Sequence, residues 1–367
     1  MMKKCDMYTM LSKVLTLRWC KNMTEHNQPS SADVPPPDAI LMQMLFGALM
    51  QRSICVATKL GIADLLSEKP QTATELAAKT ETHAPSLYRV LRTLASAGIF
   101  AKTADQKFEL TPIAALLRQG TPNSMRDFAI MMDEEWIWSA WGELMYSVKT
   151  GRVAHEKVQG LSSFEFFTQN REAGMVFNRA MTNLSLSVIP AIVEAYDFSG
   201  VGKLVDIAGG HGLLLAGILK ANPQVQGILF DLPSVIEGAD ELLHKEGVRH
   251  RVEFASGDFF QSVPAGAGAY MMKHIIHDWD DEHSIRILQN IGSAMNKNGK
   301  VLIVEMVVPE GNEPSPSKAL DLLMLVMEGG KERTKGEYRK LLEASGFNLT
   351  RIIPTKSPYS VIEGQPA

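Results

Sequence analysis

One histidine and two glutamates in the second half of the chain have the types and positions of a proton-transfer site. His277 follows the apolar run at residues 270–276, which predicts a buried strand with the histidine at its end. With an ordinary pKa of about 6.5, histidine accepts a proton near neutral pH. Glu305, in the next apolar run, and Glu332, before the last predicted helix, are placed to orient and charge the imidazole. The pattern predicts a general base supported by carboxylates.

A glycine-rich turn between an apolar run and a helix lies upstream of this segment. Residues 204–207 predict a parallel strand, and Gly209, Gly210 and Gly212 let the backbone bend sharply and approach a ligand. The helix that follows presents free N–H groups and the positive end of its dipole, which favour a ligand with an anionic group. A dinucleotide fingerprint needs a third glycine where this chain has Leu215, so NAD is the weaker ligand hypothesis.

Two further strand ends carry groups that suit a nucleoside. Asp231 ends a strand-like run, and a carboxylate there can accept hydrogen bonds from both hydroxyls of a ribose. Asp258 and Phe259 follow another run and place a hydrogen-bond acceptor beside an aromatic face, which suits the amine and ring of adenine. Because parallel strands end at one edge of a sheet, we expect these residues and the glycine turn to hold one nucleoside-containing cofactor.

Three carboxylates after His277 raise the alternative of a metal site that would bind the substrate through its oxygens. Asp278, Asp280 and Asp281 are nearly consecutive, and consecutive residues after a strand point in different directions. We therefore expect no metal site. If the histidine acts as base without a metal, its surroundings must raise its proton affinity, because transfer from a hydroxyl with a pKa of about 10 to a free imidazole is uphill by roughly 5 kcal/mol.

The elements around these residues predict an α/β fold with a separate helical region before it. Strand-like runs alternate with helical segments after residue 200, which predicts a doubly wound parallel sheet with its ligand at the carboxyl ends of the strands. Residues 39–120 predict helices followed by a strand pair, a winged-helix pattern that raises a ligand-sensing transcription factor as a rival. Only Arg89 and Arg92 lie in the second helix, too few cations for phosphate-driven binding, so we expect no nucleic-acid partner.

The helical segments between residues 131 and 185 are rich in methionine and aromatic residues. These side chains either fill the core or wall an apolar pocket around a flat aromatic molecule, and the sequence leaves both possibilities open. The candidates are Met132, Trp136, Trp138, Phe177 and Met181.

Composition and charge are those of an ordinary soluble enzyme. The chain has 367 residues, 45% of them hydrophobic, and a net charge of −4, which leaves room for two domains with cores and argues against nucleic-acid binding. Three cysteines, all before residue 56, form neither a disulfide framework nor a zinc pattern, which indicates a cytoplasmic protein. We expect no signal peptide, transmembrane span or membrane partner, because charges interrupt residues 1–23. Residues 24–38 predict a polar, proline-rich linker.

Taken together, the motifs resemble the S-adenosylmethionine-dependent small-molecule O-methyltransferases, which include plant caffeate and flavonoid enzymes, acetylserotonin methyltransferase and bacterial tailoring enzymes. The resemblance runs from about residue 41 to 361, and its motifs are LVDIAGGHG, FDLP, SGDFF, MKHIIHDWDDE, VLIVE and GGKERT. Ala208 departs from the pattern, since plant members have the first of three glycines there. The resemblance implies a Rossmann-like methyltransferase sheet, an N-terminal winged-helix-like dimerisation domain and a homodimer.

The resemblance also assigns roles to individual residues. His277 matches the general base of the family, and Glu305 and Glu332 match the two acidic residues that flank it. Acceptor contacts fall near Met131 or Met132 and near Met181 and Met327, and the aromatic pattern adds Trp136. The residues that match the S-adenosylmethionine site are Gly209, Gly210, Gly212, Asp231, Asp258, Phe259 and Lys273.

The sequence thus predicts a homodimeric enzyme that transfers a methyl group from S-adenosylmethionine to a hydroxyl of a small aromatic molecule, with His277 as general base. The expected domains are a flexible N-terminal extension and linker (1–38), a dimerisation domain (39–185) and a cofactor-binding domain (186–367). Two rivals stay open. One is a nicotinamide-dependent oxidoreductase, disfavoured by Leu215 and by the lack of a suitable Tyr and Lys pair. The other is a methyltransferase-like regulator without turnover.

Overall fold

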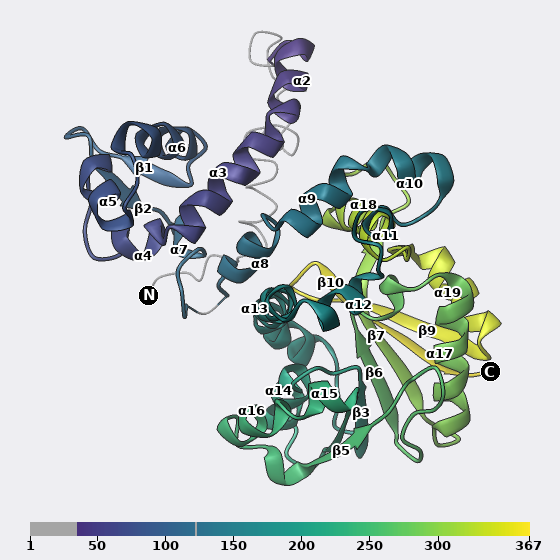
Figure 1. Ribbon diagram of the computed structural model, residues 1–367. Coiled ribbons are helices and arrows are strands. Elements are labelled where there is room, and N and C mark those ends of the chain that lie inside the picture. Colours follow the sequence, from purple (N-terminus) through teal and green to yellow (C-terminus); the bar gives the residue numbers. More distant parts are fainter. Residues whose placement is uncertain (1–34, 122) are drawn as a thin grey trace, which may run out of the picture. The chain divides into compact units, whose positions relative to one another are not determined.

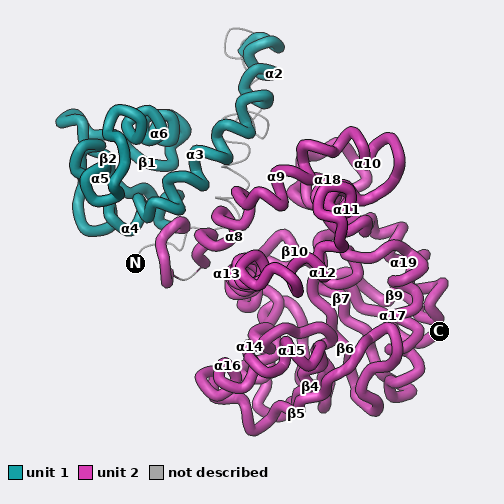
Figure 2. Tube along the Cα trace, in the orientation of Figure 1, with its two compact units in different colours: residues 1–115 teal, residues 116–367 magenta. Residues whose placement is uncertain are grey.

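The structure is a computed structural model that describes residues 35–121 and 123–367, and its chain divides into two compact units, Met1–Ala115 and Leu116–Ala367 (Figures 1 and 2). Packing therefore assigns the helices after residue 115 to the second unit. The sequence analysis placed a boundary at residue 185 instead, and the roles it gave to the three domains remain a prediction. Most of the expected flexible extension lies outside the described residues, but Pro37 and Asp38 already belong to a helix.

The first unit consists of helices and one small sheet. Helix α5 begins with a capping box, in which Thr72 and Glu75 satisfy each other's backbone N–H groups. Antiparallel strands β1 and β2 follow α6, which agrees with the predicted winged-helix pattern. The elements are α2 (Pro37–Leu45), α3 (Gly47–Lys59), α4 (Ile62–Leu66), α5 (Ala73–Thr80), α6 (Ala84–Ser96), β1 (Phe100–Lys102), β2 (Phe108–Leu110) and α7 (Pro112–Ala115).

Helices α2 and α3 expose an apolar surface. The helical stretch Pro37–Lys59 has 23 residues and a mean hydropathy of 1.5, so by length and composition it is able to cross a membrane. The sequence analysis expected no transmembrane span and did not single out this stretch, in which Gln51 and Arg52 interrupt the apolar run. An exposed apolar patch of this kind marks an interaction surface. Its large side chains, each at least half exposed, are Leu41, Met42, Met44, Leu45, Phe46 and Leu49.

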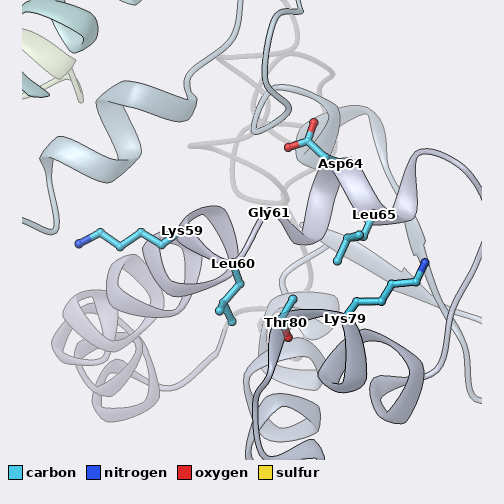
Figure 3. A pocket seen from close by; sticks show the side chains of 7 residues that line it. All are labelled: Lys59, Leu60, Gly61, Asp64, Leu65, Lys79 and Thr80. Carbon is cyan, nitrogen blue, oxygen red and sulfur yellow. The ribbon is translucent and has the colours of Figure 1, made fainter.

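A hollow of about 440 Å³ lies in the first unit, around the turn at Gly61 (Figure 3). None of the predicted site residues lines this hollow, and all of them lie in the second unit. Its lining residues are Lys59, Leu60, Gly61, Asp64, Leu65, Lys79 and Thr80.

The second unit is built on a mixed sheet with the strand order β5-β4-β3-β6-β7-β10-β9, and β8 pairs with β7. The five strands from β5 to β7 in this order are parallel, whereas β10 is antiparallel to both of its neighbours. The strands are β3 (Lys203–Ile207), β4 (Gln226–Asp231), β5 (Val252–Ser256), β6 (Ala269–Lys273), β7 (Lys300–Val308), β8 (Arg333–Thr334), β9 (Phe347–Pro354) and β10 (Tyr359–Pro366).

Helices cover both faces of this sheet (Figure 1). Successive strand residues point to opposite faces, so Leu204 packs with α13, α14 and α16 while Val205 packs with α17 and α19. This is the doubly wound arrangement predicted from the sequence. The helices are α8 (Arg126–Met131), α9 (Glu135–Gly142), α10 (Leu144–Thr150), α11 (Ala154–Gln159), α12 (Ser163–Gln169), α13 (Arg171–Ala195), α14 (Leu213–Ala221), α15 (Pro233–Ile236), α16 (Ala239–Lys245), η1 (Arg249–Arg251), η2 (Ile276–Asp278), α17 (Asp281–Ala294), α18 (Pro316–Met327) and α19 (Lys335–Ala344).

Candidate active site

The strand order brings the predicted cofactor residues to one edge of the sheet. Because β5, β4, β3 and β6 are parallel neighbours, their carboxyl ends lie side by side. The glycine turn follows β3, Asp231 ends β4, Asp258 comes two residues after β5, and Lys273 ends β6. The structure thus gathers the four predicted strand ends.

The glycine turn is held to the neighbouring strand by a hydrogen bond. The N–H of Gly210 donates to Oδ2 of Asp231 at 2.8 Å, and the N–H of Leu232 donates to the other oxygen at 2.7 Å. Gly212 has φ +79° and begins α14 directly. Ala208, the residue that departs from the glycine pattern of the family, also adopts a positive φ of +51°. This conformation costs a residue with a Cβ about 1–2 kcal/mol, so the loop keeps its shape at the expense of strain.

A carboxylate that the sequence analysis missed lies beneath this turn. Asp206 is buried in β3, and a Cβ on Gly209 would stand only 2.6 Å from its Oδ2. Gly209 is thus needed to accommodate Asp206 as well as to form the turn. Burial raises the pKa of Asp206 to about 7, opposed by the Lys273 amine. The available signal was a single charged residue inside an otherwise apolar strand.

Lys273 supplies an amine at this carboxyl-end edge of the sheet. Burial lowers its pKa to about 8, although the nearby carboxylates Asp206, Glu305 and Asp278 favour the charged form. The amine interacts with Asp206 of β3, and its Nζ lies 3.3 Å from Nδ1 of His274.

Asp258 and Phe259 form a tight turn after β5. Oδ1 of Asp258 accepts from the N–H of Phe260 at 2.8 Å, and the Asp258 side chain is exposed. The Phe259 ring packs against Phe260 with a centroid distance of 4.8 Å and against Trp279 at 6.1 Å. The turn thus combines an exposed carboxylate with an aromatic group, and its role at adenine stays a prediction.

His277 lies in a buried cluster of carboxylates. Its Nδ1 bonds Oε1 of Glu332 at 2.5 Å, and its Nε2 lies 3.3 Å from Oδ1 of Asp278. Burial by itself lowers the pKa of His277, but the charges of Asp278, Glu332 and Glu305 and the bond to Glu332 outweigh burial and raise this pKa to about 9. The imidazole is thus oriented by Glu332 and made strongly basic.

Glu305 supports the histidine in a different way from the one predicted. Its Oε1 accepts from the backbone N–H groups of Ile275 at 3.2 Å and His277 at 3.1 Å, and its Oε2 accepts from the Tyr338 hydroxyl at 2.5 Å. Instead of binding the imidazole, Glu305 fixes the backbone that carries it, while its charge still raises the pKa of His277.

The backbone after His277 is fixed by a fully buried arginine. Arg333 donates to the carbonyl of Ile276 at 2.9 Å and of Trp279 at 3.0 Å, and it pairs with Asp281 at 2.8 Å. Gly330 packs against the same segment so closely that a Cβ there would overlap the His277 carbonyl oxygen and stand 2.6 Å from the Trp279 nitrogen. The loop before α19 therefore supplies Glu332 and also clamps the segment that carries His277.

The three aspartates after the histidine have separate partners. Asp278 approaches His277, Asp280 caps α17 by accepting from the N–H of His283, and Asp281 pairs with Arg333. Within residues 35–121 and 123–367, no group of three or more His, Cys, Asp or Glu side chains is arranged to hold a metal ion.

The four predicted acceptor contacts belong to one apolar cluster. Trp136 and Met327 are buried in it, and Met132 and Met181 pack against it partly exposed. Phe167 makes an edge contact with Trp136 at 4.9 Å and stacks on Phe177 at 4.6 Å. Of the two other candidates, Phe177 packs against the cluster and Trp138 is not among its members.

This cluster adjoins the histidine segment. Phe164 of α12 stacks on Trp279 with a centroid distance of 6.5 Å, and Met327 precedes the loop that packs on His277 by only a few residues. Helix α12 and the loop after α18 thus connect the apolar cluster to the segment that carries His277.

Comparisons with known proteins agree with this geometry. The O-methyltransferase domain family matches residues 141–348, and the O-methyltransferase dimerisation domain family matches residues 42–120. Phenazine O-methyltransferase PhzM of Lysobacter antibioticus is 47% identical over 344 residues, which cover 94% of this chain and 100% of the relative. Mitomycin biosynthesis 6-O-methyltransferase of Streptomyces lavendulae is 38% identical over 338 residues, which cover 91% of this chain and 96% of the relative.

A solved structure links the fold to its cofactor. The O-methyltransferase NcsB1 from neocarzinostatin biosynthesis, in complex with S-adenosylmethionine and 2-hydroxy-5-methyl naphthoic acid, is 29% identical with a TM-score of 0.74. The match covers 86% of this chain and 96% of that one. Family and geometry lead to one conclusion: the chain belongs to the S-adenosylmethionine-dependent O-methyltransferases, and it is such an enzyme.

Proposed function

We propose that the enzyme methylates a hydroxyl group, phenolic in character, of a small aromatic molecule, and that His277 is the general base. The observation that carries the proposal is the buried His277 imidazole, bonded through Nδ1 to Glu332 and raised in pKa to about 9. S-adenosylmethionine, when bound, supplies an electrophilic methyl group on a sulfonium. The protein has to align the hydroxyl with that group and remove its proton.

The raised pKa of His277 makes the proton transfer nearly balanced. A phenol has a pKa of about 10, so transfer to a base with a pKa of about 9 costs about 1.4 kcal/mol, against roughly 5 kcal/mol for a free imidazole. The imidazolium that results stands beside the forming phenolate and stabilises it. Glu332, at Nδ1, stabilises the imidazolium in turn.

The strand ends fit S-adenosylmethionine group by group. Asp231 would accept from the ribose hydroxyls, Asp258 and Phe259 would contact the adenine, and the glycine turn with Lys273 would face the charged amino-acid end of the cofactor. The turn supports this assignment, because the Gly210 bond fixes the Asp231 carboxylate while each oxygen keeps a second lone pair.

Binding and turnover measurements test the function. Calorimetric titration should show saturable binding of S-adenosylmethionine and none of NAD or duplex DNA, and incubation with a panel of phenols should add one methyl group to a member of the panel. Asp231→Ala should raise the Kd for S-adenosylmethionine about tenfold or more, because each hydrogen bond to a charged group contributes about 1.5–3 kcal/mol. Binding of NAD with hydride transfer, or DNA binding without methyl transfer, would establish a rival instead.

The relatives and the apolar cluster support a flat aromatic acceptor. The names of two relatives state phenazine and mitomycin chemistry, and the cluster around Trp136 and Phe167 presents aromatic faces to an aromatic ring. We propose the same general class here, in a cytoplasmic enzyme of small-molecule biosynthesis.

We further propose a homodimer whose contact includes the exposed apolar surface of α2 and α3. The dimerisation family match covers this surface almost completely. Leu45→Glu, at a side chain that is 66% exposed, should shift the protein from dimer to monomer in sedimentation velocity, because it buries a charge in an apolar contact. Val148→Glu on α10, also 66% exposed, lies outside the matched dimerisation region and should leave the dimer intact. Dissociation by Val148→Glu alone would place the interface elsewhere.

A further inference from the structure

His274 is a residue of the active-site segment to which neither the motifs nor the resemblance gave a role. It lies between Lys273, which ends β6, and His277. Its φ of +57° is in the left-handed region, which only a few per cent of residues with a Cβ adopt, histidine more often than most. Backbone strain beside a reaction centre is maintained by the surrounding structure and points to a need for that side chain.

The His274 ring contacts both of its functional neighbours. Its Nδ1 lies 3.3 Å from the Lys273 Nζ, and its face stacks on the His277 ring with a centroid distance of 5.0 Å and an angle of 23°. Tyr359 of β10 packs against it at 4.8 Å. A protonated lysine amine only donates, so Nδ1 is the acceptor and the ring proton is on Nε2.

His274 stays neutral while it makes these contacts. Burial and the charges of Lys273 and His277 hold its pKa well below the ordinary value. Its Nε2 is buried and has no hydrogen-bond partner among the described residues. A buried donor without a partner reduces stability, so packing alone does not account for a histidine at this strained position.

We propose that His274 is a positioning residue for methyl transfer. Its Nδ1 holds the Lys273 amine in place for the cofactor, and its ring, stacked on the His277 imidazole, holds that imidazole in the orientation that reaches the acceptor. This inference rests on the proposed roles of Lys273 and His277. One side chain thus links the cofactor side of the site to the base. The charged groups that also act on His277 are Asp278, Glu305, Glu328 and Glu332, whereas Lys273 acts on His274.

Two substitutions separate the two contacts of His274. Glycine and asparagine both tolerate a positive φ, so His274→Gly and His274→Asn should fold, with melting temperatures no lower than that of the wild type. Asparagine keeps a side-chain oxygen that can accept from Lys273 but has no ring to stack on His277, whereas glycine loses both contacts.

The expected results differ between the variants. His274→Gly should raise the Kd for S-adenosylmethionine about three- to tenfold, and His274→Asn should restore most of the affinity, because one hydrogen bond is lost and regained. Both variants should move the acidic limb of the kcat/KM profile to lower pH by about half a unit, because an aromatic face over His277 favours its protonated form.

Three outcomes would overturn the proposal in whole or in part. A wild-type Kd together with a wild-type pH profile in His274→Gly would show that the residue only fills space. A raised Kd that His274→Asn does not restore would remove the role at Lys273, and an unmoved acidic limb would remove the role at His277. Failure of the wild type to methylate any phenol would instead contradict the proposed function, while the cofactor titrations would still report on Lys273.

Discussion

His277→Ala is expected to lower turnover about 10²–10⁴-fold and to leave the Kd for S-adenosylmethionine nearly unchanged. The imidazole lies at the acceptor side, bonded to Glu332, whereas the predicted cofactor contacts lie at the ends of β3, β4, β5 and β6. Steady-state kinetics and calorimetry on the same preparation measure both quantities. Full activity in this variant would contradict general-base catalysis by His277.

Two further measurements make this test stricter: the pH dependence of kcat/KM and the methylation of a more acidic phenol. In the wild type, kcat/KM should fall on acidification with a midpoint near pH 9, because only the neutral imidazole can take the proton and its pKa is about 9. A phenol that is already ionised at neutral pH should be methylated by His277→Ala almost as well as by the wild type. His283→Ala, at a half-exposed histidine on α17, is the matched control and should leave turnover unchanged.

Gly330→Ala is expected to reduce both turnover and stability, although it adds only one methyl group. That group would overlap the carbonyl oxygen of His277 and the backbone of Asp278, and backbone atoms cannot move aside as a flexible side chain does. The expected loss of unfolding free energy is about 1–3 kcal/mol, the usual cost of overpacking. Because the shift displaces His277 itself, we expect turnover to fall by about 10²-fold, as a misplacement of about 1 Å does.

Gly336→Ala is the control for this substitution. A Cβ at Gly336, on α19, would meet its nearest atoms at 3.8 and 3.9 Å, which is ordinary van der Waals contact. Denaturant unfolding and kinetics of the two variants should therefore differ clearly. Equal behaviour would mean that the loop before α19 does not position His277.

Local sequence patterns were sufficient to predict the strand ends but not the contacts between distant segments. Asp231 and Asp258 could be predicted because each follows an apolar run whose end a parallel sheet must place at its edge. His277 was expected at the end of a strand over residues 270–276, but β6 ends at Lys273 and His277 lies in η2. The bond of Glu305 to the backbone of Ile275 and His277 could not be predicted, because it depends on the register of β7 against β6. Asp206 was missed for a related reason: the order of apolar and polar residues in β3 does not show whether a carboxylate at this position is buried or exposed.

The apolar segments show the same limit. Methionine and aromatic residues on α8, α9 and α13 fit both a core and a pocket, and only packing placed Trp136, Met181 and Met327 in one cluster. The exposed surface of α2 and α3 went unnoticed because its polar interruptions hide an apolar face that a continuous helix brings together.

The carboxylate of Glu305 ties three parts of the chain into one rigid block. It joins strand β7, the backbone of the segment that carries His277, and the Tyr338 hydroxyl of α19. Separating these three parts would leave the buried carboxylate without its hydrogen bonds, and an unpaired buried charge is costly in free energy. The contacts among α9, α12 and α13, by contrast, are made by aromatic rings and involve no buried charge. The polar side of the site is therefore held by hydrogen bonds to a buried charge, whereas the apolar cluster is held by ring packing.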